Sequence, residues 1–117
     1  INGDVNYSRD FTYIDNVIQA NLLSLVTTNK KAINTVYNVA YGERNTLNDL
    51  KRYLKEYLSE FYSKILNIEF IYGPNRAGDI PHSHASIEKA KENLNYNPQF
   101  NLQKGLRQAV KWYWKNL

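Results

Sequence analysis

Apolar side chains recur at intervals of three and four residues over four stretches of the chain, a spacing that places them on one face of a helix. The clearest stretch starts at Leu47 and carries leucine and aromatic side chains as far as Phe61, with lysine and other polar residues between them. Thr46 and Asp49 have the spacing of a capping box in which the acid replaces the usual Glu or Gln. The other three helices are predicted over residues 14–28, 86–94 and 102–113.

Polar residues and proline mark the ends of the shorter helices. Ser86 and Asn101 are predicted N-caps, because their side chains can accept hydrogen bonds from the first free N–H groups of a helix. Tyr96-Asn97-Pro98 ends the helix that Ser86 begins, since proline cannot continue it. Asp15 and Asn16 are interpreted as serving the start of the first helix rather than any chemistry.

Two short stretches have the composition of β-strands. Residues 35–40 are almost all apolar, β-branched or aromatic, as in a strand covered on both faces, and Gly42 follows them. Residues 68–72 form a second predicted strand after the long helix. Residues 9–13 are short, aromatic and expected to be extended. The predicted fold class is therefore α/β, a small domain with few strands and about four helices.

Length and charge limit the class of protein. A chain of 117 residues with an apolar fraction of 43% fits one folded domain, over residues 1–117. Its net charge is +4, but the only adjacent basic pairs are Lys30-Lys31 and Lys51-Arg52. A nucleic-acid-binding surface more often clusters its basic residues on one face, so an anionic small molecule fits at least as well, and no nucleic-acid partner is expected. A stand-alone basic binding module is the alternative, and it predicts binding that falls steeply with salt.

The composition also excludes some kinds of site. The chain has no cysteine, so it has neither disulfides nor a thiolate metal site, and this suits a reducing cytoplasm. No apolar run is long enough to span a membrane, so no membrane partner is expected. The chain starts at Ile1 without a methionine, and we interpret it as a piece of a longer protein.

The stretch from Tyr72 to Ser86 has the richest chemistry of the chain. Arg76 and Asp79 lie three residues apart around Gly78. A guanidinium can hold a phosphate, a carboxylate can accept hydrogen bonds from neighbouring hydroxyls, and glycine lets the backbone approach a ligand closely. Phosphate beside ribose is what a nucleotide presents. The two histidines that follow lack further ligands for a metal, and no metal site is predicted.

Several separate motifs together resemble the nucleotide-sugar epimerases of the extended short-chain dehydrogenase/reductase family. Ser8-Arg9-Asp10-Phe11-Thr12-Tyr13-Ile14-Asp15-Asn16-Val17 resembles the Arg-Asp-Phe-x-Tyr-Ile-Asp-Asn-Val signature of these enzymes. Val36-Tyr37-Asn38-Val39-Ala40 and Arg76-Ala77-Gly78-Asp79-Ile80-Pro81-His82-Ser83 are similar to a later strand and loop. Ser86-Ile87-Glu88-Lys89-Ala90 with Tyr96-Asn97-Pro98 is similar to their closing segment. The resemblance covers nearly all of the chain, in the right order.

Within the family, Ile1-Asn2-Gly3-Asp4 and His82-Ser83 look most like bacterial UDP-N-acetylglucosamine 4-epimerases of polysaccharide biosynthesis. The resemblance implies a substrate-binding domain. It implies that Arg9 and Arg76 contact the diphosphate of a UDP-sugar, and that Asp79 holds the ribose. Asn2 would lie near uracil, and the small Ser83 would leave room for a 2-acetamido group.

The same resemblance implies what this chain lacks. The family binds NAD and carries its catalytic Tyr-x-x-x-Lys pair in an N-terminal Rossmann half. The glycines here lie at 3, 42, 73, 78 and 105 and form no dinucleotide-binding loop, and no tyrosine is followed by lysine four residues later. We therefore expect no catalytic or cofactor-binding residue in this chain, NAD and a Rossmann domain in the full-length protein, and a homodimer.

Alternatives remain at this point. A dehydratase or decarboxylase of the same family fits these residues equally well, because the residues that decide the chemistry lie upstream. A structural domain without a ligand predicts that Arg9 and Arg76 point to different faces, whereas a substrate domain predicts that Arg9, Arg76 and Asp79 converge on one concave face. Arg9 could also pair simply with Asp10. A missing half further predicts an exposed apolar patch where it would pack.

Overall fold

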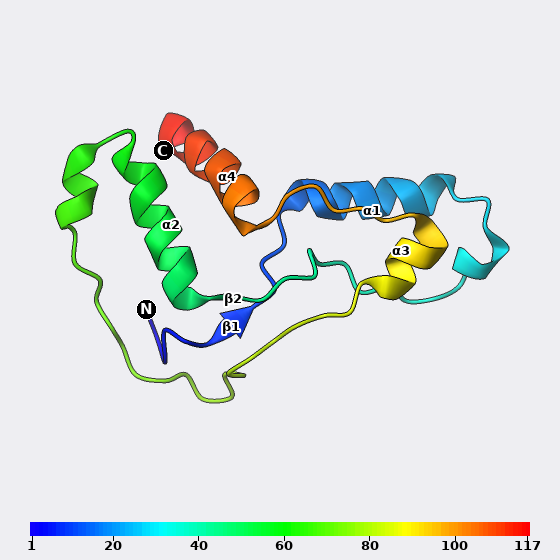
Figure 1. Cartoon of the computed structure of the whole chain (residues 1–117), viewed down its shortest axis with the longest axis horizontal. Coiled ribbons are helices and arrows are strands. Elements are labelled where there is room, and N and C mark those ends of the chain that lie inside the picture. The colour runs from blue at the N-terminus through cyan, green and yellow to red at the C-terminus, as the bar shows by residue number, and fades with distance from the viewer.

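The computed structural model describes all 117 residues as an elongated arrangement of four α-helices, two 3-10 turns and one two-stranded sheet (Figure 1). In chain order the elements are β1 (Ser8–Arg9), α1 (Ile14–Val26), η1 (Lys30–Ala32), β2 (Asn45–Thr46), α2 (Leu47–Ser59), η2 (Ser63–Asn67), α3 (Glu88–Leu94) and α4 (Leu102–Asn116). The prediction of a small domain with about four helices and few strands is confirmed.

The helix boundaries follow the local capping chemistry in two of the predicted cases. The Asn101 side chain accepts the Lys104 N–H at the start of α4. At α2, Thr46 and Asp49 form the complete capping box. The N-cap prediction for Ser86 is wrong, because α3 begins at Glu88 with Ile87 at the cap and no side-chain hydrogen bond. Ile87 is buried, so packing fixes this helix start rather than capping.

The predicted strands over residues 35–40 and 68–72 do not form. The only sheet pairs β1 with β2 antiparallel, with Ser8 opposite Thr46 and Arg9 opposite Asn45. A strand is completed by a ladder of backbone hydrogen bonds to a neighbouring strand, and neither segment belongs to the sheet of this chain. Residues 68–72 begin a long run that follows the open edge of the molecule as far as α3 (Figure 1).

The main core lies where α1 and α3 pack side by side (Figure 1). Five buried residues form it, namely Ala20, Ala40, Ile87, Ala90 and Tyr96. The buried hydroxyl of Tyr96 donates to the Ala40 carbonyl at 2.7 Å, which satisfies both polar groups inside the core. This bond fixes the segment after η1 against the connection between α3 and α4.

Asn16 is almost completely buried and ties α1 to that same connection. Its amide nitrogen donates to the Phe100 carbonyl at 2.7 Å, and its oxygen accepts from the Gln99 and Phe100 N–H groups. The interpretation of Asn16 as a helix-start residue is therefore wrong. Its three hydrogen bonds reach a segment more than 80 residues away, a distance in sequence that local capping rules do not cover.

The chain is more open than its length requires. Its radius of gyration is 17.0 Å, whereas a compact domain of this length has about 13 Å. Its accessible surface is 8225 Å², against about 6,600 Å² expected for a compact protein of this mass. Four apolar side chains on one side of α1 stay exposed, Ile14 at 56%, Ile18 at 47%, Leu22 at 57% and Leu25 at 81%. We call this row the α1 stripe, and it fits the apolar patch expected from the sequence.

None of the helices combines the length and apolar character needed to cross a membrane.

The capping box at α2 gives a testable contribution to stability. Thr46→Ala removes the oxygen that accepts the Asp49 N–H at 3.0 Å, and we expect it to lower the free energy of unfolding by about 1 kcal/mol. Hydrogen bonds from Thr46 also lower the pKa of Asp49. The carboxylate form is the stabilised one, so this contribution is present at neutral pH and is lost on acidification through the lowered pKa. Urea denaturation of wild type and variant between neutral and acid pH should show their difference shrinking as the pH falls.

Candidate functional site

Arg9 and Asp79 lie 70 residues apart in sequence and form a direct ion pair. Arg9 Nη2 lies 2.6 Å from Asp79 Oδ1, and both side chains are about a quarter exposed. Arg9 Nη1 donates to the carbonyls of Ser8 and Pro81 at 2.9 and 3.3 Å. The guanidinium is therefore held at the surface by β1 on one side and the 76–83 loop on the other. Its partner is Asp79, so the simple alternative of an Arg9–Asp10 pair is wrong.

Arg76 is held by the start of the chain. In the amide orientation that satisfies both side chains, Asn2 Oδ1 accepts from Arg76 Nε and Nη2 at 3.0 and 3.2 Å. Asn2 and Gly73 form a parallel bridge, and the Gly73 N–H donates to the Ile1 carbonyl at 2.7 Å. A Cβ at Gly73 would meet the end of the Asn2 side chain, so a larger residue here would require the Asn2 amide to move.

Ser83 lies beside β1 through a second bridge. The Ser8 N–H donates to the Pro81 carbonyl at 2.9 Å, and the Ser83 N–H donates to the Ser8 carbonyl at 3.0 Å. Ser8 Oγ and His82 Nδ1 are 2.9 Å apart and share a hydrogen bond. Between the two bridges, the Asp79 N–H donates to the Arg76 carbonyl at 3.2 Å. The structure thus links all five predicted site residues, Asn2, Arg9, Arg76, Asp79 and Ser83, in one hydrogen-bonded region.

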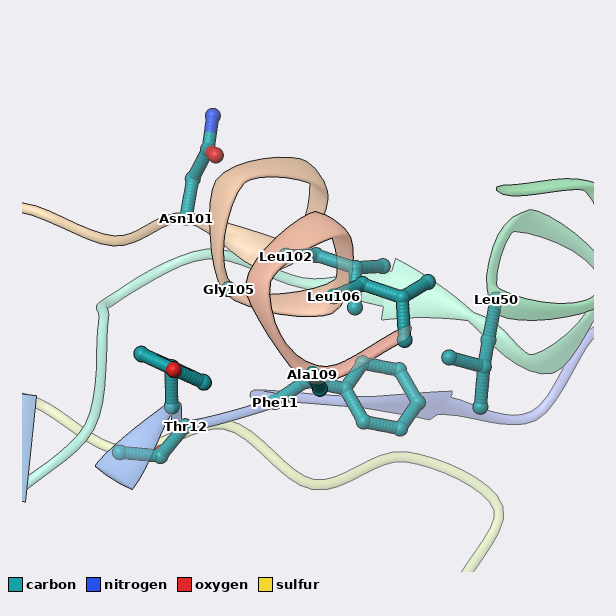
Figure 2. A pocket seen from close by; sticks show the side chains of 9 residues that line it. Phe11, Thr12, Leu50, Asn101, Leu102, Gly105, Leu106 and Ala109 are labelled. Carbon is teal, nitrogen blue, oxygen red and sulfur yellow. The ribbon is translucent and has the colours of Figure 1, made fainter. Parts of the chain in front are cut away.

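A hollow with a volume of about 180 Å³ lies away from this hydrogen-bonded region, between α2, α4 and residues 11–13 (Figure 2). The side chains around it are mostly apolar and none is charged. A diphosphate needs cationic or N–H donors, so this hollow does not suit one. The Arg9–Asp79 pair, by contrast, combines a guanidinium donor with a carboxylate acceptor.

Two residues of this region were missed by the sequence reasoning. Ser8 is buried and connects β1 to the loop, although its sequence context carries no signal for that role. The Asp10 carboxylate accepts from the backbone N–H groups of Tyr41 and Gly42, at 3.2 Å and 3.0 Å. His84 Nδ1 lies 3.7 Å from Asp10, whereas His82 contacts Ser8. The two histidines therefore face different partners and do not form a metal pair.

Comparison with known proteins shows that this chain is similar to part of UDP-sugar 4-epimerases. No protein-family model matches it. It is 35% identical to UDP-glucuronate 4-epimerase 4 of Arabidopsis thaliana over 91% of the chain. The structure of UDP-glucose 4-epimerase from Thermotoga maritima with UDP-glucose superposes on 99% of the chain with a TM-score of 0.83 and 35% identity. A UDP-N-acetylglucosamine 4-epimerase from Methanobrevibacter ruminantium, in complex with UDP-N-acetylmuramic acid, superposes on 100% with a TM-score of 0.83 and 32% identity.

The match covers only part of each relative. The chain spans 25% of the Arabidopsis protein, and 34% of both the Thermotoga and the Methanobrevibacter chains. The matched region is the C-terminal part of these proteins.

Proposed function

Because the chain belongs to the nucleotide-sugar epimerases and corresponds to their C-terminal part, we propose that it binds the UDP-sugar of an NAD-dependent 4-epimerase. The observation that carries this proposal is the Arg9–Asp79 contact at 2.6 Å. It sets a guanidinium and a carboxylate side by side, as a diphosphate and its ribose stand side by side in a sugar nucleotide.

Each residue has a defined part in this proposal. Arg9 and Arg76 neutralise the diphosphate, since charge-assisted bonds from a planar guanidinium are the strong ones. Asp79 accepts the ribose hydroxyls, and this requires its carboxylate to share or exchange its bond with Arg9. Asn2 lies beside Arg76 and meets the base. Binding energy from this unreacting part of the substrate holds the sugar in place for the reaction.

The small side chain of Ser83 favours an N-acetylhexosamine as the sugar. A bulky residue at this position would exclude a 2-acetamido group, whereas serine leaves it room. The Methanobrevibacter relative is named for UDP-N-acetylglucosamine, which supports this choice. UDP-glucose is the second candidate sugar.

The NAD site and the catalytic groups are proposed to lie outside this chain. The five glycines here do not have the spacing of a dinucleotide-binding loop. These residues do not fit NAD, so we assign NAD and the catalytic groups to an N-terminal Rossmann domain of the same protein. We also propose a homodimer, and a cytoplasmic location consistent with the lack of cysteine.

The α1 stripe is the proposed contact with that Rossmann domain. Isoleucine and leucine side chains exposed to this degree on one helix face are typical of a surface that another part of the protein covers. Leu22→Ala is expected to lower the unfolding free energy of the protein that carries this chain by about 2–5 kcal/mol, as for a buried leucine. Leu66→Ala, a leucine of η2 with 54% exposure, is the matched control and should change it by less than about 0.5 kcal/mol. If Leu22→Ala and Leu66→Ala change the free energy of unfolding by equally small amounts in urea denaturation, the α1 stripe is exposed to solvent and does not contact another domain.

The test of the function is an assay of the native gene product, whose mass is measured first. We expect a protein well above 117 residues that interconverts UDP-N-acetylglucosamine and its C4 epimer when NAD is bound. Release of carbon dioxide or water from the sugar instead would assign it to the decarboxylases or dehydratases of the family. A gene product no longer than this chain, without any conversion of a UDP-sugar, would refute the proposal.

A further inference from the structure

We propose that Ser8 and His82 are positioning residues for the UDP-sugar, acting as a clip that holds the 76–83 loop against β1. The proposal rests on the function proposed above and adds two residues to it. Neither side chain has the planar, always-charged fork of donors with which Arg9 is proposed to bind the diphosphate. Their effect is exerted through the loop that carries Arg76 and Asp79.

The clip is a set of hydrogen bonds between Ser8 and the loop. Three hydrogen bonds join Ser8 to the 76–83 loop. The Ser8 N–H donates to the Pro81 carbonyl, the Ser83 N–H donates to the Ser8 carbonyl, and the Ser8 hydroxyl shares a hydrogen bond with His82 Nδ1. Two of them are backbone bonds, which any side chain could keep. Only the third depends on residue identity, and it joins a side chain that is 3% exposed to one that lies in solvent.

The clip is placed where it sets the distance between the binding groups. Ser8 immediately precedes Arg9, and His82 follows Asp79 by three residues. The Arg9 guanidinium also contacts the carbonyls of Ser8 and Pro81, the two residues that the clip joins. If the loop moves away from β1, Asp79 and Arg9 separate, and one ligand can no longer meet both.

An alternative use of His82 is less consistent with these contacts. A metal site is not supported, because no group of three or more His, Asp or Glu side chains lies together in the structure. A role in the core does not apply to an exposed imidazole. Its one side-chain hydrogen bond goes to the residue beside Arg9, and this directs the inference to positioning.

The experiment measures UDP binding by calorimetry and steady-state kinetics on the protein that carries this chain. His82→Ala and Ser8→Ala are each expected to raise the Kd for UDP about three- to tenfold, the effect of one hydrogen bond. The KM for the UDP-sugar should rise with little change in kcat, because the interaction serves ground state and transition state alike. The double variant should be no weaker than the single ones, since both remove the same bond.

Two further variants separate positioning from a structural role. His82→Asn places an amide near the position of Nδ1 and should restore most of the binding. His84→Ala changes the neighbouring loop histidine, which faces Asp10, and should leave the Kd unchanged. Since His82 is exposed, its variants test the clip even if Ser8→Ala does not fold.

The outcomes distinguish this inference from the function on which it rests. Wild-type protein that binds UDP, together with His82→Ala that binds it equally well, would overturn the clip alone. Additive losses in the double variant, or no rescue by asparagine, would also contradict it. Wild-type protein that binds no UDP would overturn the proposed function first, and the clip with it.

Discussion

Replacing Arg9 by alanine is expected to raise the Kd for UDP about 10- to 100-fold, because it removes charge-assisted hydrogen bonds to the diphosphate. The loss should be largest at low salt, where the charge of the ligand is least screened. Arg9→Lys keeps the charge but not the planar fork of donors, so an intermediate loss is expected. Calorimetric titration with UDP, on the protein that carries this chain, measures the Kd of wild type, Arg9→Ala and Arg9→Lys and its dependence on salt.

The control for this prediction is Arg107→Ala. It removes the same charge, but the Arg107 guanidinium pairs with Glu60 at 2.9 Å and lies over the Tyr57 ring between α2 and α4. Its Kd for UDP should remain that of the wild type. If both variants lose affinity equally, the effect belongs to net charge, and Arg9 is not a specific diphosphate contact.

Tyr96→Ala is expected to have the largest effect on stability, about 3–5 kcal/mol, because it empties the centre of the main core. Tyr96 is 1% exposed and packs with Ala20, Ala40, Ile87 and Ala90. Tyr96→Phe keeps the ring but leaves the Ala40 carbonyl without its partner, for a smaller loss of about 1–3 kcal/mol. Tyr62→Phe, whose ring is 47% exposed, is the control and should stay within about 0.5 kcal/mol of wild type.

The buried phenol of Tyr96 is expected to make the free energy of unfolding depend on pH in the alkaline range. Burial, with a smaller contribution from the charge of Asp10, raises the pKa of Tyr96 from 10.0 to about 12. The protonated phenol is the form that the fold favours, so its contribution is complete below pH 10 and is lost as the pH rises toward 12. Urea denaturation across this range should show a steeper alkaline loss in wild type than in Tyr96→Phe. Parallel curves would mean that the phenol does not couple to folding.

The helices of this chain could be predicted from sequence because their signals are local. The three- and four-residue spacing and the caps at Thr46 and Asn101 all act within one or two turns, and the structure confirms them. Ile87 shows the limit of this approach. It starts α3 by packing into the core, and the nearby serine, a better capping residue, is not used.

The strands could not be located because pairing is not a local property. Residues 35–40 and 68–72 have strand composition, but a strand needs a neighbour, and the pairing that forms joins residues 8–9 to 45–46. In the proposed function, part of the surroundings of these segments belongs to the rest of the protein.

The candidate site residues were proposed through resemblance, together with the convergence of Arg9, Arg76 and Asp79, but their individual contacts were not predicted. The contacts of Arg9 with Asp79 and of Ser8 with His82 each join positions at least 70 residues apart. No periodicity or spacing rule covers such distances. The structure shows that these side chains meet, while their contact with a ligand remains a prediction.

The most direct test of the central claim is a crystal structure of the protein that carries this chain with UDP-N-acetylglucosamine bound. We expect the Arg9 and Arg76 guanidiniums to lie within hydrogen-bonding distance of the diphosphate, and the Asp79 carboxylate to contact the ribose hydroxyls. A nucleotide bound away from all three residues, with the Arg9–Asp79 ion pair still closed, would contradict it.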